Sequence, residues 1–577
     1  MPSFQPMSRP WFWFAGIGLA IFILLQIIPM MQESSGAESH RTLSRSAAGQ
    51  KAAAIAAESF GISAVDPQDI EMTYLSDSAA VGYLAQQALF DRYREQWDAS
   101  HPLEVYRADL PLHDGSDSGW LTLYLHPETG KLVGWQSAGG GQSAAAHRGE
   151  GPGQALQFAA SWGEQSDRWI WDGNEPDARG FYTFLSRSSD IGEASLLLHV
   201  QMPNDAAKAN SETSTPWKGG AITYSVQVPA GFTAYLAQQE KLAGHFNAWG
   251  FVVPQLLLMI MAIVYAATRK SYTSGRRGMA LAALFWVLYA AFYFNLVPGF
   301  RAALLADGAA GDPSAIHSLI VVNLIILAIM AVFTYLAAVG GDGLWKSMGR
   351  SLWPRWREKN YGEAVLAGMK RGYLLAFLLL GVQSVILAGL GQAIGMFQSS
   401  DASQSSYNMI LPWLLLLLAW CAGISEEMQS RLFGIGLFRH WLVGGATRLL
   451  GRAPSRRGLT LLTAAAMFPP GLFWAFGHVS YAVYPVYSRL IELVILAMLF
   501  GWFMLRFGFL SVLFAHIILD SILMSVQLLS DGLPGGWVAG IAGPLLPAIV
   551  ALLLGWAHRR RAGCKGTGAW IASTRGH

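Results

Sequence analysis

Long apolar stretches separated by short polar segments fill this chain after residue 248, and one more lies near the N-terminus at Trp11 to Met31. A helix needs about 20 apolar residues to cross a bilayer. The pattern therefore predicts an all-α polytopic membrane protein with about ten transmembrane helices. The predicted spans are residues 11–31, 249–268, 279–299, 315–340, 373–397, 408–424, 459–477, 489–505, 508–528 and 533–557.

Residues 32–247 interrupt this pattern with the composition of a soluble α+β domain. Period-two alternation bounded by turn residues predicts strands, and the turn Pro127-Glu128-Thr129-Gly130 predicts a hairpin. Helices are predicted at 52–60 and 154–162, and strands at 120–125, 131–136, 180–185, 195–201 and 221–228. Helix followed by strands occurs twice, which suggests a duplication. The hairpin resembles that of small PepSY-like modules, but we favour an unclassified ligand-sensing or protein-binding domain.

Lysine and arginine are concentrated in every second loop between the predicted spans, and such loops face the cytoplasm. We therefore predict a multi-pass protein of the cell membrane with both termini cytoplasmic and residues 32–247 extracytoplasmic. The predicted divisions are a stub and membrane anchor at 1–31, the outer domain at 32–247, accessory transmembrane helices at 248–345, a basic cytoplasmic loop at 346–371, an intramembrane core at 372–558 and a basic cytoplasmic tail at 559–577.

Composition supports a membrane protein and excludes other classes. Hydrophobic residues make up 53% of the chain and charged residues 13%, against about 25% charged in soluble proteins. The net charge of +3 comes from basic residues in loops, which indicates orientation and no nucleic-acid partner. Both cysteines, Cys421 and Cys564, lie outside 32–247, so this domain has no disulfide framework or cysteine-ligated zinc. The oligomeric state is not determined by the sequence.

Three short patterns carry ionisable side chains in or beside predicted spans. Charged groups at bilayer depth are costly and usually mark a functional site. The patterns are Glu426-Glu427-x-x-x-Arg431, Trp474-x-x-x-His478 and His516-x-x-x-Asp520.

Helical spacing assigns these side chains to pairs. Residues four apart share one face of a helix, so Glu427 can pair with Arg431, and Asp520 can orient His516 and favour its charged form. Glu426 is rotated by about 100° from Glu427 and can face a different environment. One glutamate can then stay ionised against the arginine while the other exchanges protons as a general base.

The three patterns resemble the motifs of the CPBP family of intramembrane proteases, also called the CAAX-protease and bacteriocin-processing or abortive-infection family. That family has Glu-Glu-x-x-x-Arg, Phe-x-x-x-His and His-x-x-x-Asn/Asp in this order on successive spans. The resemblance covers about residues 370–560 and does not extend to the outer domain or the first span. Trp474 stands where the family has phenylalanine, which affects the shape of the pocket rather than the chemistry.

The resemblance implies an endopeptidase that hydrolyses a peptide bond of a membrane-associated or CAAX-like substrate. Glu426 with His478 would activate water, and His516 with Asp520 would support the oxyanion. An ionised Asp520 would repel the oxyanion unless His516 is protonated or a metal intervenes. The supporting residues would be Glu427 and Arg431, which would determine the shape and charge of the site, and Trp474, which would form an aromatic wall.

A metal is left open at this stage. Glutamate and histidine are plausible zinc ligands, and Glu426, His478 and His516 would be the ligands if zinc is used. A metal-free glutamate mechanism is about equally compatible with the family resemblance.

Two other functions compete with the protease. One is a catalytically silent membrane scaffold, or an immunity or regulatory protein, whose outer domain binds a partner. The other is a transporter or channel using the ionisable groups as a proton path, although the spans show no clear inverted repeat. Other intramembrane proteases are excluded, because His-Glu-x-x-His is absent and Ser425 is followed by glutamate rather than glycine. Arg489 and Glu492, three residues apart, are predicted to pair with each other.

Overall fold

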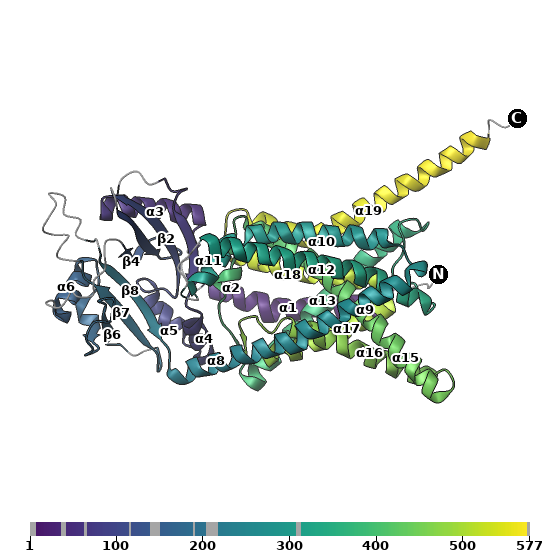
Figure 1. Ribbon diagram of the computed structural model, residues 1–577, viewed down its shortest axis with the longest axis horizontal. Coiled ribbons are helices and arrows are strands. Elements are labelled where there is room, and N and C mark those ends of the chain that lie inside the picture. The colour runs from purple at the N-terminus through teal and green to yellow at the C-terminus, as the bar shows by residue number, and fades with distance from the viewer. Residues whose placement is uncertain are drawn as a thin grey trace.

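The computed structural model describes residues 7–35, 42–62, 66–114, 117–138, 151–188, 191–203, 217, 219–306, 308 and 313–573. Figure 1 shows an antiparallel sheet with its helices at one end of the molecule and a bundle of long helices extending away from it. The first helix begins, and the last helix ends, at the end of the bundle opposite the sheet (Figure 1).

The sheet domain contains eight antiparallel strands in the order β1-β2-β3-β4-β8-β7-β6-β5. Two four-stranded meanders, each preceded by a helix, meet through their last strands, with Trp135 opposite Ile222. The helix-then-strands order in the sequence is therefore present twice in the structure. The strands are β1 Glu71–Ser76, β2 Glu104–Asp114, β3 Asp117–Leu125, β4 Leu132–Ala138, β5 Trp169–Trp171, β6 Tyr182–Ser186, β7 Ser195–Gln201 and β8 Ala221–Gln227. The helices are α3 Arg45–Phe60, α4 Ser78–Gln87, α5 Phe90–Tyr93 and α6 Pro152–Ser161, with a π-helical turn η2 at Arg94–Asp98 and a 3-10 turn η4 at Ser166–Arg168.

Both helices that precede the meanders pack on the sheet through small side chains. Ala48, Ala52 and Ala56 lie on one face of α3 and are fully buried, which lets the helix approach strands β1 to β3 closely. The sequence analysis missed β1, β2 and β5. In β2, Tyr106, Ala108 and Leu110 alternate with polar residues as in a half-buried strand, but a proline at 111 argues against a strand interior.

Nine helices of the described chain are long and apolar enough to cross a membrane. They are Arg9–Gln32, Ala230–Thr268, Gly275–Asn295, Ser314–Ser347, Tyr361–Ile394, Arg456–Phe476, Tyr487–Phe507, Phe509–Ser530 and Gly536–Arg561. Nine of the ten predicted spans coincide with them, so the helical fold is confirmed and is consistent with a polytopic membrane protein. The elements are α1 Arg9–Phe22, η1 Ile23–Ile27, α2 Ile28–Ser35, α8 Ala230–His245, η5 Phe246–Val252, α9 Val253–Thr268, η6 Lys270–Tyr272, α10 Gly275–Asn295, α11 Val297–Ala306, α12 Pro313–Ser347, α13 Tyr361–Ile394, α16 Arg456–Phe476, α17 Tyr487–Phe507, α18 Phe509–Ser530 and α19 Gly536–Ser573.

The predicted span at 408–424 differs from the structure. Residues 402–415 form three short 3-10 turns, η7 Ala402–Gln404, η8 Ser406–Asn408 and η9 Pro412–Leu415, and the helix begins only at Leu416. It then continues without interruption as α14 Leu416–Glu426, the π-helix η10 Glu427–Ile435 and α15 Gly436–Leu450. Proline at 412 fits the first turn of a helix rather than its interior. Glu426, Glu427 and Arg431 lie close together in the interior of this helix, which is not among the nine apolar ones.

Helix α13 begins at Tyr361, inside the predicted basic loop 346–371, and α19 continues past 559 into the predicted tail, whose last four residues lie outside the described part.

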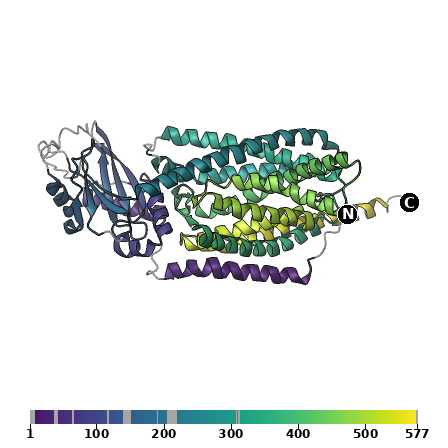
Figure 2. The same ribbon diagram turned by 90° about the horizontal axis from the view of Figure 1, so that it is seen from below.

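The loop between α13 and α14 attaches the sheet domain to the bundle. Asn408 is fully buried, and its amide accepts a hydrogen bond from the Tyr74 N–H at 2.8 Å and donates to the Tyr74 carbonyl at 2.7 Å. It pairs with the free edge of strand β1 as a neighbouring strand would. Nearby, the Ser399 hydroxyl donates to the Ser78 carbonyl, and strand β9 Phe397–Gln398 pairs with β10 Val483–Tyr484. Figure 2 shows the sheet domain at one end of the helix bundle.

Replacing Asn408 by alanine should loosen this attachment. Both Tyr74 backbone groups would lose their partner in a buried place, and each loss costs about 1–3 kcal/mol. We expect Asn408→Ala to lower the Tm of the detergent-solubilised protein by several degrees, measured by thermal unfolding. Asn174→Ala, at an exposed turn, is the control, and equal Tm values for the two variants would contradict this role.

Asp531 ends α18 beside the same loop. Its Oδ2 accepts a hydrogen bond from the Ser406 hydroxyl at 2.5 Å, and its carbonyl accepts one from the Tyr407 hydroxyl at 3.1 Å. Burial raises the pKa of Asp531 to about 6, and the charge of Glu104 adds to this, while the bond from Ser406 opposes it. The folded protein therefore holds this proton at a pH where the unfolded chain has lost it.

This raised pKa predicts a pH-dependent stability. The stabilising contribution is fully present below about pH 4 and is lost as pH rises through about 6, a change of up to about 3 kcal/mol. Asp531→Asn keeps an acceptor for Ser406 without the charge. We expect the difference in Tm between the variant and the wild type to be larger at pH 7.5 than at pH 4.5, in favour of the variant. A difference independent of pH would contradict this assignment.

Candidate intramembrane active site

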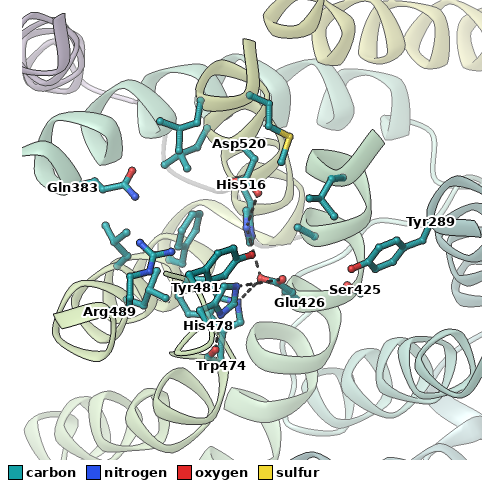
Figure 3. Close-up of a pocket in the computed structure, with 18 of the residues that line it drawn as sticks. Tyr289, Gln383, Ser425, Glu426, Trp474, His478, Tyr481, Arg489, His516 and Asp520 are labelled. Carbon is teal, nitrogen blue, oxygen red and sulfur yellow. Dashed lines mark hydrogen bonds and ion pairs between the residues drawn. The ribbon is translucent and has the colours of Figure 1, made fainter. Parts of the chain in front are cut away.

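Each of the three sequence patterns contributes side chains to one cavity. Glu426 is the last residue of α14, His478 follows the end of α16, and His516 and Asp520 lie one turn apart on α18. They line a cavity of about 280 Å³ together with apolar side chains of the same helices. Figure 3 shows the carboxylate of Glu426 between the two imidazoles. The structure thus brings together residues separated by up to 94 positions, since 520 − 426 = 94.

A change of helix type separates the two glutamates. The α-helix ends at Glu426, and the π-helix η10 begins at Glu427. The Glu426 side chain is 24% exposed and faces the cavity, whereas Glu427 is completely buried. Short π-helical turns within α-helices often occur at functional sites. The two neighbouring carboxylates therefore occupy the different environments expected from their spacing.

Each Glu426 oxygen faces a different histidine. Oε1 lies 3.8 Å from Nε2 of His478, and Oε2 lies 3.8 Å from Nε2 of His516. The indole N–H of Trp474 donates a hydrogen bond to Oε2. A separation of 3.8 Å is too long for a direct hydrogen bond, but it lets one small molecule bond to both groups. Oε2 of Glu426 thus accepts a hydrogen bond from Trp474, while Oε1 faces His478.

His478 is held in one orientation. Its Nδ1 donates to the Trp474 backbone carbonyl at 2.8 Å, so in the neutral ring the lone pair lies on Nε2, the atom that faces Glu426. The ring of Tyr481 stacks on the imidazole at 5.9 Å with an interplanar angle of 14°. A backbone acceptor that fixes the tautomer of a histidine is typical of catalytic and metal-binding imidazoles.

His516 has carboxylates at both ring nitrogens. Nδ1 lies 2.8 Å from Oε1 of Glu427, and Nε2 lies 3.4 Å from Oδ2 of Asp520. Each nitrogen can therefore donate an N–H to an acceptor, while the ring itself is 4% exposed. Asp520 does not act on the cavity as an isolated negative charge, because this imidazole lies between it and Glu426.

Arg431 completes the buried part of the site. Its guanidinium lies 3.4 Å from Glu427, and the side chains are 1% and 0% exposed. The guanidinium carbon lies 4.1 Å from the centre of the Trp474 ring and 5.1 Å from that of Phe500. Cations stack favourably on aromatic faces, and arginine does so most often. Two aromatic rings and one carboxylate thus compensate a charge that has no access to water.

A second polar cluster at the cavity contains the predicted pair Arg489 and Glu492 and one further residue, Gln383. Arg489 and Glu492 pair at 2.6 Å, as their spacing predicts. The Gln383 amide donates to the other Glu492 oxygen at 2.7 Å. The sequence analysis missed Gln383, which comes from α13 and lines the cavity. A polar residue inside an apolar span was the available signal.

The donor types at the site suit a zinc ion. Two imidazole Nε2 atoms and a carboxylate are usual zinc ligands, and the second nitrogen of each histidine is already bonded to an acceptor, as metal-bound histidines require. The present N–O separations of 3.4–3.8 Å are those of ion pairs. Over the described residues, no group of three or more His, Cys, Asp or Glu side chains is arranged to hold a metal.

The buried network predicts a large effect of Arg431→Met on stability. Removing one member of a buried ion pair leaves the other charge uncompensated and costs about 3–5 kcal/mol. We expect a clear drop in Tm, part of which Glu427→Gln/Arg431→Met recovers because the remaining charge is also removed. Arg448→Met, at the exposed end of α15, is the control. A double variant less stable than Arg431→Met would contradict this account.

Comparisons of the chain with protein-family models, with curated proteins and with solved structures gave no match. The fold and the site described above are therefore the basis for assigning a function.

Proposed function

We propose that this protein is an intramembrane endopeptidase of the CPBP type that hydrolyses a peptide bond of a membrane-associated peptide or protein. The observation that carries the proposal is the position of Glu426, whose two carboxylate oxygens face His478 and His516 across a cavity within the helix bundle. This arrangement offers a proton acceptor and fixed hydrogen-bond donors on the same side of a substrate carbonyl.

Water activation is assigned to Glu426 and His478. A water molecule bonded to Glu426 Oε1 and His478 Nε2 would lie between them at the 3.8 Å separation. Its oxygen attacks the substrate carbonyl carbon, and its proton passes to the base. The tetrahedral intermediate then collapses, the carbon–nitrogen bond breaks, and the leaving amine takes that proton. Water supplies both the hydroxyl of the new acid and the hydrogen of the new amine.

Oxyanion stabilisation is assigned to His516. An N–H at Nε2, oriented through the bond between Nδ1 and Glu427, would donate to the oxygen of the tetrahedral intermediate. Removing one such donor typically costs about 3–4 kcal/mol of transition-state stabilisation. Asp520 keeps this N–H in place before the substrate carbonyl arrives.

If zinc binds, Glu426, His478 and His516 would hold it, and it would supply a Lewis acid that lowers the pKa of bound water. The arrangement of the protein groups supports water activation with or without it.

We further propose that the end of the bundle with both termini is cytoplasmic, which places the sheet domain outside the cell membrane. The support is the basic character of the loops at this end, including 346–360 and 451–457. Substrate would be a single-span protein, a leader peptide or a CAAX-type peptide held at the bilayer.

Glu426→Gln should slow cleavage strongly, because an amide cannot accept the water proton. We expect kcat to fall by about 10²–10⁴-fold. The measurement uses purified full-length protein in liposomes with a pooled set of single-span and CAAX-type peptides, and mass spectrometry of the products. Glu363→Gln, at an exposed position near the start of α13, is the matched control and should retain wild-type activity.

The same assay separates the remaining alternatives. A parallel reaction with a chelator distinguishes the two mechanisms. Cleavage stops if the mechanism depends on a metal and continues if it does not. Equal cleavage by wild type and Glu426→Gln would remove Glu426 as the base. No cleavage by folded wild-type protein would favour the membrane scaffold or regulatory protein whose outer domain binds a partner.

A further inference from the structure

A helix outside the three-motif region lines a second cavity at the site. This cavity of about 210 Å³ shares Glu426, Trp474 and His478 with the first, and its other wall includes Phe251, Gln255 and Leu258. These three residues belong to η5 and α9, which continue the helix that leaves the sheet domain. Glu426 and His478 therefore lie at the junction of two cavities, and one of them is completed by an accessory helix.

Reciprocal contacts between glycine and phenylalanine hold this helix against the end of α16. A Cβ at Gly250 would lie 2.4 Å from the Phe476 ring, and a Cβ at Gly477 would lie 2.8 Å from the Phe251 ring. Gly477 immediately precedes His478. The position of the accessory helix is thus fixed next to a proposed catalytic residue.

Gln255 is the polar side chain that α9 directs into this cavity. Its neighbours Leu256 and Leu257 are 50% and 59% exposed on the outer surface of the bundle. Its Nε2 lies 3.5 Å from Oε1 of Gln429, and Gln429 in turn donates to the Thr334 hydroxyl at 3.0 Å.

The Gln255 Oε1 atom is buried and has no hydrogen-bond partner. The chain of hydrogen bonds from Gln255 through Gln429 to Thr334 therefore leaves one acceptor, Gln255 Oε1, without a donor. An unpaired buried carbonyl within a membrane protein is costly, and the peptide N–H of a substrate is a donor that would satisfy it. An extended peptide whose scissile bond lies at Glu426 would bring its neighbouring residues into the two cavities.

We propose that the second cavity is a substrate subsite in which Gln255 accepts a hydrogen bond from one backbone N–H of an extended peptide, on one side of the scissile bond. The inference rests on the proposed peptidase function. The substrate feature recognised at this site is a backbone N–H. A proline at that substrate position, which has no N–H, is disfavoured. The accessory helix is thereby part of the substrate site.

The test is a double-mutant cycle between protein and substrate. The probe is the peptide of the pool that the full-length wild type cleaves fastest. Backbone N–H groups within three residues of the scissile bond are replaced one at a time by ester oxygen, leaving the scissile amide intact. For the wild type, one substitution lowers kcat/KM by about fivefold to thirtyfold, the loss expected for one buried hydrogen bond.

Gln255→Leu lowers kcat/KM for the parent peptide by a similar factor, mainly through KM, and shows no further loss with that one ester. Gln255→Met, which keeps the length of the side chain without the acceptor, is used in the same way if the leucine variant unfolds. Asn323→Leu is the matched control, since the Asn323 amide bonds within its own accessory helix to the Leu319 carbonyl. It should retain the wild-type sensitivity to the ester.

Additive losses, or unchanged cleavage of the parent peptide by Gln255→Leu and Gln255→Met, would overturn the subsite while leaving the peptidase in place. Absence of cleavage by the wild type would overturn the peptidase function and the subsite together.

Discussion

The buried charge of Arg431 is the constraint around which the site is built. A guanidinium with 1% exposure inside a helix bundle must be compensated, and Glu427 provides the opposite charge while Trp474 and Phe500 provide aromatic faces. Glu427 also bonds to His516, so the same carboxylate holds the arginine and orients the imidazole. This sharing ties η10, α16 and α18 together at one point. The cavity-facing Glu426 is positioned because its neighbour is fixed in the interior.

Much of this arrangement could be predicted from the sequence, because it depends on helical spacing. Residues four apart on one helix must share a face, which gave the Glu427–Arg431 and His516–Asp520 pairs. Nine of the ten predicted spans followed from hydropathy alone. The remaining span, 408–424, was misplaced. The apolar residues before Leu416 form 3-10 turns, and the charged residues after it continue a helix that hydropathy does not recognise.

Other features depend on contacts between distant helices, and no local pattern indicates them. The π-helix at Glu427 and the indole N–H that donates to Glu426 are examples. Trp474 was expected to change only the shape of the pocket. It instead contacts the proposed base directly, through a donor that phenylalanine lacks. Gln255 and Gln383 were visible as polar residues in apolar spans, but their direction depends on how α9 and α13 pack against the rest of the bundle.

The sheet domain is joined to both walls of the site by connections that are structured along their length. Asn408 fixes the free edge of β1 to the loop that leads directly into α14 and Glu426. On the other side, β8 is followed by α8, which continues through η5 into α9 and reaches Gln255. A change in the position of the domain would therefore act on Glu426 and on the accessory-helix wall together, because neither connection contains a long flexible linker. The glycine contacts at Gly250 and Gly477 leave little room for the helix to shift without moving the segment that holds His478. Rigid coupling of this kind gives the sheet domain a physical route to the candidate site.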